Sequence, residues 1–327
     1  MASPIVRFIF GACFLALIHT ASAQQTPAPY TDANGVLVAQ NDAAIEQARL
    51  FQKPAAITNS NSVTADGMAL GDASPSSDDS FGDQVILKSQ PRPRFFTVTG
   101  DATIFYTDNV ALTRRAEVDD SFFVAHAGGS WNPHIGRNLD AQFGATVSTF
   151  RYNDTSSLDF TNLGFGTGLF WSPESLRGIG IFARYDFIEL LNRHSDEILQ
   201  DHEFTLGAQK IFALGRSHAF TIGGTAMAGI SNPRAAQRDQ LGMFFAYQLQ
   251  LTRSLDTELS YRPALHFYNS NGRVDLNQVV SWNLRYHLAP WAEANAFFSF
   301  GSNRSDRSVF DYDVVTTGFG VGLTAKF

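Results

Sequence analysis

Residues 313–327, DVVTTGFGVGLTAKF, alternate between two kinds of side chain up to the C-terminus. One face holds the apolar residues Phe319, Val321, Leu323, Ala325 and Phe327, and the other holds Gly318, Gly320, Gly322, Thr324 and Lys326. A period of two is typical of a β-strand, because successive side chains in a strand point to opposite faces. The apolar face must be shielded from water. In a soluble protein a second layer of secondary structure covers it, and in a transmembrane barrel lipid does so. The stretch therefore predicts a strand with one apolar face, and the earlier segments must decide between the two covers.

The same alternation recurs from Arg94 onward, in segments of about the ten residues that a membrane-spanning strand requires. In one of them, Ala141, Phe143 and Ala145 alternate with Gln142 and Gly144. We predict about twelve strands, at residues 95–107, 118–131, 139–152, 158–171, 178–191, 199–212, 218–231, 239–252, 256–268, 274–288, 290–300 and 313–327. The expected fold class is all-β: a transmembrane, antiparallel, up-and-down β-barrel with a largely disordered N-terminal leader.

The connections between these segments fall into two sets. The set on the side of the barrel's termini is shorter and comprises residues 132–138, 172–177, 213–217, 253–255 and the corner at Ala289. The opposite set is longer and richer in charged, Asn and Ser residues, and comprises residues 108–117, 153–157, 192–198, 232–238, 269–273 and 301–312. Short periplasmic turns and longer outer loops are typical of outer-membrane-type barrels, so the connections favour lipid as the cover.

Tryptophans and tyrosines near the predicted strand ends sort by end. The tryptophans Trp131, Trp171 and Trp291 fall at the periplasmic rim, and the tyrosines Tyr106, Tyr152, Tyr268 and Tyr312 fall at the outer rim. Amphipathic aromatic rings gather at the two interfaces of a membrane. We therefore predict that these seven residues form two membrane-interface girdles.

Composition and charge restrict the class of protein further. The 327 residues include 29 Phe and 26 Gly, and only 17% are charged, which suits strands better than helices. The net charge is −7 and no basic stripe is present, so we expect no nucleic-acid partner.

Residues 1–23 are predicted to be a secretory signal peptide. Arg7 supplies the positive region, residues 8–18 the apolar run, and Ala21-Ser22-Ala23 a cleavage site of small residues. The weaker alternative is a lipoprotein anchor at Cys13, which only a few apolar residues precede. Cys13 is the sole cysteine and leaves with the signal peptide, so we expect no disulfide or thiol chemistry in the mature chain.

Residues 24–93 form a predicted mobile periplasmic leader, because they contain few aromatic and many small polar residues. One short helix is expected from about residue 42 to Lys53, ended by Pro54. Either this helix frays in the leader, or it enters the barrel as a plug or hooks a periplasmic partner. Residues 81–88 are a further candidate strand.

The signal peptide, polar leader, alternating strands, aromatic girdles and terminal Phe327 together resemble Gram-negative outer-membrane β-barrel proteins, over about residues 94–327. The aromatic strand end followed by Asp108-Asn109-Val110 also resembles the first strand and loop of a porin-like barrel family. The resemblance implies that Phe327 is the C-terminal signal read by the outer-membrane insertion machinery. It also implies outer-membrane lipid as the surroundings and, by analogy, channel or transport work.

The predicted inward faces supply candidates for a solute pathway. The pore-lining candidates are Asp140, Arg184, Asp186, Gln248, Glu258, Arg262, Arg285 and Glu293. These side chains form either a mixed-charge constriction that selects solutes or ion pairs that only satisfy one another. Inward Phe95, Phe105, Phe170, Phe182 and Phe297 show no obvious alignment, so we expect no aromatic row of the kind that guides sugars.

The sequence favours no enzyme, cofactor or metal site. His194, Ser195 and Asp196 are consecutive in one loop and cannot converge as a catalytic triad. His126, His202, His266 and His287 lie on different strands without metal-ligand spacing. We expect a porin-like channel for passive diffusion of small hydrophilic solutes. The alternatives are a non-conducting barrel that acts in export or assembly with a periplasmic partner bound through residues 24–93, and a structural or adhesive surface barrel.

Overall fold

The computed structural model describes residues 44–50, 95–115, 117–215, 217–270 and 272–327. Its strands are β1 (Phe96–Thr107), β2 (Asp120–Trp131), β3 (His134–Gly136), β4 (Leu139–Tyr152), β5 (Phe160–Trp171), β6 (Ile179–Asn192), β7 (Glu197–Ala213), β8 (His218–Asn232), β9 (Arg238–Gln250), β10 (Leu255–Tyr268), β11 (Val274–Ala289), β12 (Ala292–Ser305) and β13 (Tyr312–Lys326). Four single-turn 3₁₀ helices lie in described connections, at Ser156–Leu158, Glu174–Leu176, Arg234–Ala236 and Ser308–Phe310. Residues 44–50 are α-helical. None of the described helices is long and apolar enough to cross a membrane.

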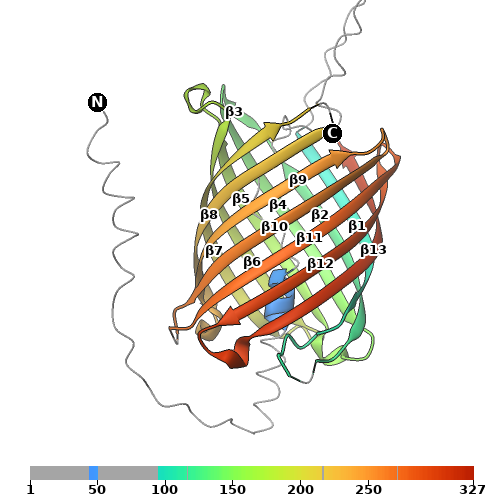
Figure 1. Cartoon of the computed structure of the whole chain (residues 1–327), viewed down its shortest axis with the longest axis vertical. Helices are drawn as coiled ribbons and strands as arrows, with labels where there is room; N and C mark the ends of the chain where they lie inside the picture. The colour runs from blue at the N-terminus through green and yellow to red at the C-terminus, as the bar shows by residue number, and fades with distance from the viewer. Residues whose placement is uncertain (1–43, 51–94, 116, 216, 271) are drawn as a thin grey trace, which may run out of the picture. The chain divides into compact units, whose positions relative to one another are not determined.

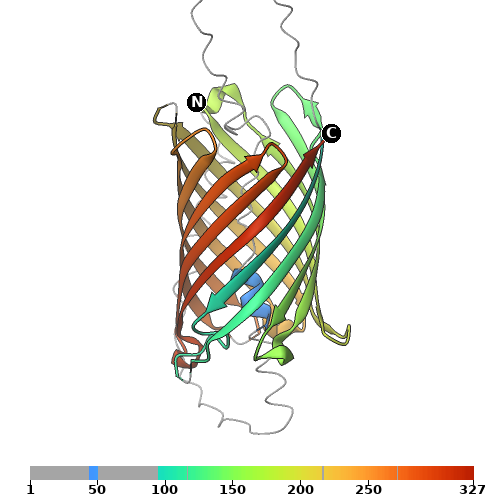
Figure 2. The ribbon, with the colours of Figure 1, turned by 90° about the vertical axis from the view of Figure 1, so that its right-hand side faces the viewer.

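The strands form one closed antiparallel barrel (Figures 1 and 2). Each spanning strand pairs with its neighbour in sequence, β1 also pairs with β13, and β2 pairs directly with β4. Strand β3 is a short addition that pairs only with the start of β4. Twelve strands therefore span the barrel, as predicted, and closure leaves no free sheet edge among them.

Strand β12 shows the largest difference between the predicted and the observed strand bounds. It ends at Ser305 and not near residue 300, because its polar last residues continue to pair with both neighbours. Gly301 lies opposite Val314 of β13, and Asn277 of β11 lies opposite Asn303. A polar composition had suggested a loop here, but inward polar residues are acceptable in a strand that lines a lumen.

We call the end of the barrel where β1 begins and β13 ends the inner end, and the opposite end the outer end. The described inner connections are 132–138, 172–178, 214–217, 251–254 and 290–291, with residue 216 outside the description. The outer connections are 108–119, 153–159, 193–196, 233–237, 269–273 and 306–311, with residues 116 and 271 outside it. The tightest turn is at the inner end and the longest loop is at the outer end, which fits periplasmic and external sides respectively.

The two faces of the wall differ in chemistry. Phe319, Val321 and Leu323 of β13 are exposed on the outside, where lipid would cover them. Several inward glycines are covered by a side chain from the neighbouring strand, as Gly318 is by the Phe105 ring and Gly223 by the Phe244 ring. A Cβ at these positions would collide with the ring. Inward glycine therefore makes room for its cross-strand neighbour.

The helix of residues 44–50, which we call the luminal helix, lies inside the barrel near the outer end (Figures 1 and 2). Ala44, Ile45 and Ala48 are buried in one cluster with apolar residues of β2, β4, β5, β6 and β7. The sequence predicted a helix here, and residues 44–50 of the expected span are helical. The remainder of the leader and of that span, the signal peptide and the candidate strand at residues 81–88 lie outside the described residues.

Candidate functional site: the two ends of the lumen

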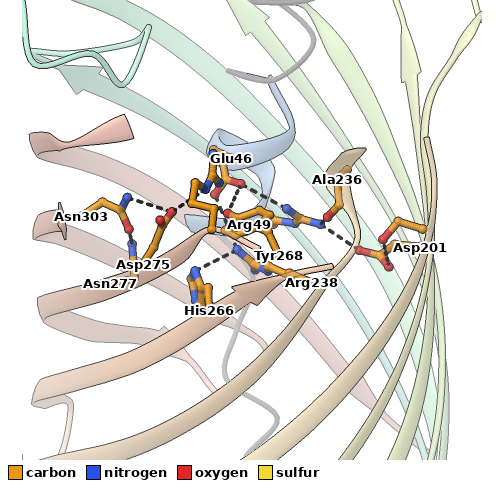
Figure 3. A network of polar contacts seen from close by, with 12 residues as sticks. Glu46, Arg49, Asp201, Ala236, Arg238, His266, Tyr268, Asp275, Asn277 and Asn303 are labelled. Carbon is orange, nitrogen blue, oxygen red and sulfur yellow. Dashed lines mark hydrogen bonds and ion pairs between the residues drawn. The ribbon is translucent and has the colours of Figure 1, made fainter. Parts of the chain in front are cut away.

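Arg49 of the luminal helix makes a buried ion pair with the barrel wall. Its Nη2 lies 3.1 Å from Asp201 Oδ2 of β7, and the two side chains are 4% and 3% exposed. The same nitrogen donates to the carbonyl of Ala236, at 2.9 Å. Ser231 of β8 donates to the other oxygen of Asp201 at 2.9 Å. Figure 3 shows this pair within a polar network that joins the helix to several strands, with Asp201 at its edge. Burial by itself lowers the pKa of Arg49. Glu46 and other nearby acidic groups raise this pKa by more, so the net shift is upward.

Glu46, on the same helix, is held by β9 and β10. Tyr268 of β10 donates to Glu46 Oε1 at 3.0 Å, and Arg49 donates to the same oxygen at 3.1 Å. Arg238 of β9 lies 3.6 Å from Glu46 Oε2. Burial by itself raises the pKa of Glu46, but the neighbouring positive groups, Arg49 first, lower it by more, to about 2. The positive neighbours of Glu46 therefore favour its charged form.

The remaining helix residues also contact the wall. Gln47 donates to the carbonyl of Val110 in the β1–β2 loop at 3.0 Å. Leu50 packs against a small buried cluster that contains Tyr312 and Val314 of β13. It also lines a small cavity with Arg262 of β10 and Phe297 of β12. The contacts of the helix thus reach the wall on all sides.

A second polar set at the outer end lies beside this network. Asp275 of β11 is 3.2 Å from Arg273 Nε and accepts from Asn303 Nδ2 of β12 at 3.2 Å. Asn277 donates to Asn303 at 3.4 Å and to the hydroxyl of Tyr312 at 3.3 Å. These side chains are buried, so the outer end is tied together across β10 to β13.

A group of stacked aromatic rings is buried at the outer end of the barrel, whereas an accessible row of the kind that guides sugars stays untested. The ring centroids in this group are 5.2 Å apart for Phe105 and Phe122, 4.9 Å for Phe122 and Tyr152, and 4.3 Å for Phe150 and Phe160. The prediction considered other inward phenylalanines and omitted Phe122, Phe150 and Phe160. All of these rings belong to or pack against the apolar cluster that holds the luminal helix.

The inner end carries a different group of charges, which we call the inner-end cluster: Gln248, Asp256, Glu258, Arg285, His287 and Glu293. Arg285 Nη2 lies 2.8 Å from Asp256 and 4.0 Å from Glu258. His287 lies 2.7 Å from Asp256 and 3.8 Å from Glu293. Gln248 donates to Glu258 at 2.9 Å. The side chains of Arg285 and Asp256 are 38% and 20% exposed, so this group faces space that water can enter.

The other four pore-lining candidates lie apart from this cluster. Arg184 and Asp186 are two residues apart on β6 and form an ion pair with each other at 2.5 Å. Arg262 lies beside Leu50 of the luminal helix. Asp140, on β4, contacts His134 of β3. Of the eight candidates, the structure brings together four at the inner end, Gln248, Glu258, Arg285 and Glu293, and whether any of the eight selects a solute stays a prediction.

The predicted outer girdle is wrong for three of its four tyrosines. Tyr152, Tyr268 and Tyr312 are each 5% exposed and lie inside the barrel, where the last two join the polar network. Tyr106 faces outward and is exposed. The prediction sorted these residues by height along the strand and ignored the period of two, which places Tyr152 on the same face as Gln142.

The three predicted periplasmic tryptophans are exposed near the inner end. Trp131 stacks on the outward rings Phe96 and Phe143, with centroids 6.0 and 5.3 Å away. Trp171 and Trp291 are also exposed. Phe327 is exposed at the C-terminus, next to Phe96 through paired backbone hydrogen bonds of 2.8 and 3.2 Å. Their roles in the interface and in insertion stay predictions.

Sequence reasoning missed most partners of the luminal helix, namely Asp201, Arg238, Tyr268 as a donor, and the backbone of Val110 and Ala236. Strand alternation was the available signal, since Asp201 lies two residues from Glu203 and on the same face of β7. No pattern in the sequence says which of these inward residues the helix meets. Within the described ranges, no group of three or more His, Cys, Asp or Glu residues is placed to hold a metal ion.

Comparison with known proteins supports the fold alone. No family model matches the sequence, and no curated protein matches it. Among solved structures, an outer-membrane channel from Pseudomonas putida F1 superposes with a TM-score of 0.52 at 10% identity, over 74% of this chain and 99% of that chain. A porin in complex with disordered oligogalacturonate gives a TM-score of 0.40 at 7% identity, over 69% and 98% of the two chains. An anion-selective porin from Comamonas acidovorans gives 0.37 at 8% identity, over 71% and 99%.

The similarity to the Pseudomonas channel agrees with the closed barrel and its apolar exterior. The chain has the porin-like fold of an outer-membrane β-barrel, and this fold places it in the outer membrane of a Gram-negative-type bacterium.

Proposed function

We propose that this barrel is a channel through which small hydrophilic solutes diffuse passively across the outer membrane. The observation that carries the proposal is the inner-end cluster, whose charged side chains are only partly buried inside the barrel. Charges that served only the fold would be more fully enclosed by their partners, as Arg49 and Asp201 are at the outer end. A patch of partly hydrated charges at a pore mouth instead acts on passing solutes through its field.

The charges of the inner-end cluster suggest a weak preference for cations. Three carboxylates, Asp256, Glu258 and Glu293, stand against the one guanidinium of Arg285. The paired opposite charges limit the net field, so the channel would discriminate weakly and would admit neutral sugars and zwitterions as well. No cofactor or catalytic role is part of this proposal.

The test is electrical recording from the refolded mature chain in planar lipid bilayers, with a salt gradient across the membrane. A variant that lacks residues 44–50 is recorded beside it. The proposal predicts steps of steady conductance in at least the deletion variant and a reversal potential that indicates a mild cation preference. Vesicles that contain the conducting protein should also swell in an isotonic pentose solution. A correctly folded barrel that never conducts, with and without residues 44–50, would rule the channel out.

A second candidate is a closed barrel that serves export or assembly through a periplasmic partner. The luminal helix favours it, since a filled outer end is compatible with a barrel that conducts nothing. Under this function the deletion variant would stay electrically silent, and the mature chain would retain a periplasmic protein that a chain without its leader does not. Recognition of Phe327 by the insertion machinery belongs to both candidates.

A further inference from the structure

We propose that the luminal helix, residues 44–50, is a plug that closes the outer end of the barrel, and that solutes pass only when it leaves its seat. This inference rests on the proposed channel function and adds its regulation. It concerns the outer end of the lumen, whereas the channel proposal is carried by the inner-end cluster.

The first argument is that the helix is enclosed by the wall. Ala44, Ile45 and Ala48 belong to a buried apolar cluster with residues of β2, β4, β5, β6 and β7. On the other sides, Glu46 contacts β9 and β10, and Leu50 packs against β13. Gln47 contacts the β1–β2 loop. A helix inside the barrel with contacts to strands on several sides obstructs the lumen (Figures 1 and 3).

The second argument is that the seat is specific for this helix. The described part of the helix has seven residues, and helices shorter than about 12 residues are marginal alone in water, so its order depends on the barrel. The wall supplies a carboxylate for Arg49, a hydroxyl and a guanidinium for Glu46, and a carbonyl for Gln47. With the helix removed, the described side-chain partner of Asp201 would be the hydroxyl of Ser231. Complementary polar groups on both sides indicate a site built for this segment.

The third argument concerns the outer connections. Of these, 193–196, 233–237 and 269–273 are short, and the described part of 108–119 is fixed by Asn109, which bonds the backbone of Thr113 and Asp313 at 2.8 Å each. Short, tied connections cannot swing far across a twelve-stranded lumen. These four connections therefore do not close this end, whereas the luminal helix contacts the wall on several sides.

The experiment ties the helix to the wall with a reversible link. Arg49→Cys and Asp201→Cys are introduced together in the mature chain that begins at Gln24, which lacks the natural Cys13. A short bifunctional thiol reagent with a disulfide in its spacer joins the two introduced thiols across the gap left by the lost ion pair. Barrel folding is checked by the gel shift between heated and unheated samples. The matched control is Arg304→Cys with Asp313→Cys, an outward ion pair of 2.8 Å near the outer end that involves only the wall.

The linked protein should be silent in planar bilayers, and reduction of the link should restore conductance steps, because the helix is then held neither by the link nor by the ion pair of Arg49 with Asp201. The control pair should conduct equally before and after reduction. Equal conductance of the R49C/D201C protein in its linked and reduced forms would overturn the plug and leave the channel standing. If both forms are silent, the chain without residues 44–50 decides: its conduction supports a plug that stays seated without the link, and its silence overturns the plug and the channel together.

Discussion

The two ends of the lumen hold arginine–aspartate pairs of similar geometry in different surroundings. At the outer end, Arg49 and Asp201 are 3.1 Å apart and 4% and 3% exposed. At the inner end, Arg285 and Asp256 are 2.8 Å apart and 38% and 20% exposed. The first pair joins a helix to the wall across 152 positions of sequence, and the second joins neighbouring strands β10 and β11.

The difference teaches that burial, and not distance, separates a structural pair from one that can act on solutes. Water competes for partly exposed charges and screens them, so the inner pair adds little to stability but keeps its field in the lumen. A buried pair is costly to break because each partner is left without solvent. We therefore assign attachment of the helix to the outer pair and contact with solutes to the inner pair.

The largest expected effect is that of Arg49→Met on stability. The change leaves Asp201 and Glu46 without their shared guanidinium, and we expect the free energy of unfolding to fall by about 3–5 kcal/mol. Arg285→Met at the inner end should cost less than about 1 kcal/mol, because water replaces the lost partner. Urea unfolding of both variants in lipid vesicles gives the comparison. Equal losses would show that burial does not distinguish the two ends.

The next effect is the pH dependence of the closed outer end. The lowered pKa of Glu46 means that its charge contributes stability above its ordinary value, 4.5, and that this contribution is lost as the pH falls towards about 2. The groups that face Glu46 are Arg49 on its own helix, Arg238 on β9, His266 and Tyr268 on β10, and Arg273 in the following loop. We expect the plug to hold equally from pH 8 to pH 5 and to loosen only below about pH 4.

Conductance of the mature chain at stepped pH measures this dependence, with Glu46→Gln as the control that has no carboxylate to titrate. The open probability of the wild type should rise below about pH 4. The open probability of the Glu46→Gln variant should not show this rise. Opening of the wild type between pH 7 and pH 5 would contradict the role of Glu46.

A smaller effect is expected at the inner end, on selectivity. Glu258→Gln removes one of three carboxylates, and Arg285→Gln removes the guanidinium. The first change should lower and the second should raise the ratio of cation to anion permeability, each by a factor of about two, because the charges stand in partly hydrated surroundings. Reversal potentials of the chain without residues 44–50 measure both. Shifts of the same sign for the two variants would exclude this cluster as the source of selectivity.

Much of the wall was predictable because each strand repeats one rule. Alternation placed Asp186, Glu258 and Arg285 on the inward face, and the structure has each of them there, in contact with other inward residues. The same rule applied to Tyr152, Tyr268 and Tyr312 would have placed them inside, but membrane height alone was used for them. That error concerned which principle to apply and not a lack of information.

The attachment of the luminal helix was not predictable in this way. Its apolar residues and its preference for a helix can be read from residues 42–53, but its partners lie on strands far along the chain. Arg49 meets Asp201, and Glu46 meets Tyr268, 222 positions away. Pairing of this kind depends on the closed barrel, in which β7 and β10 line one lumen, and nothing in the local sequence indicates it.

The smallest effect is expected for an ion pair on the outer surface of the wall. Arg304 and Asp313 are 2.8 Å apart on β12 and β13, but their side chains are 50% and 48% exposed. Arg304→Gln should change the free energy of unfolding by less than about 0.5 kcal/mol, since exposed pairs gain little over hydration. It should also leave conductance unchanged, because neither residue touches the luminal helix or the inner-end cluster. Urea unfolding of this variant beside Arg49→Met tests the expectation directly. A loss of unfolding free energy as large as that of the buried pair would mean that lipid headgroups or loop packing enclose Arg304. Exposure in the isolated chain would then not predict the strength of ion pairs at the membrane surface.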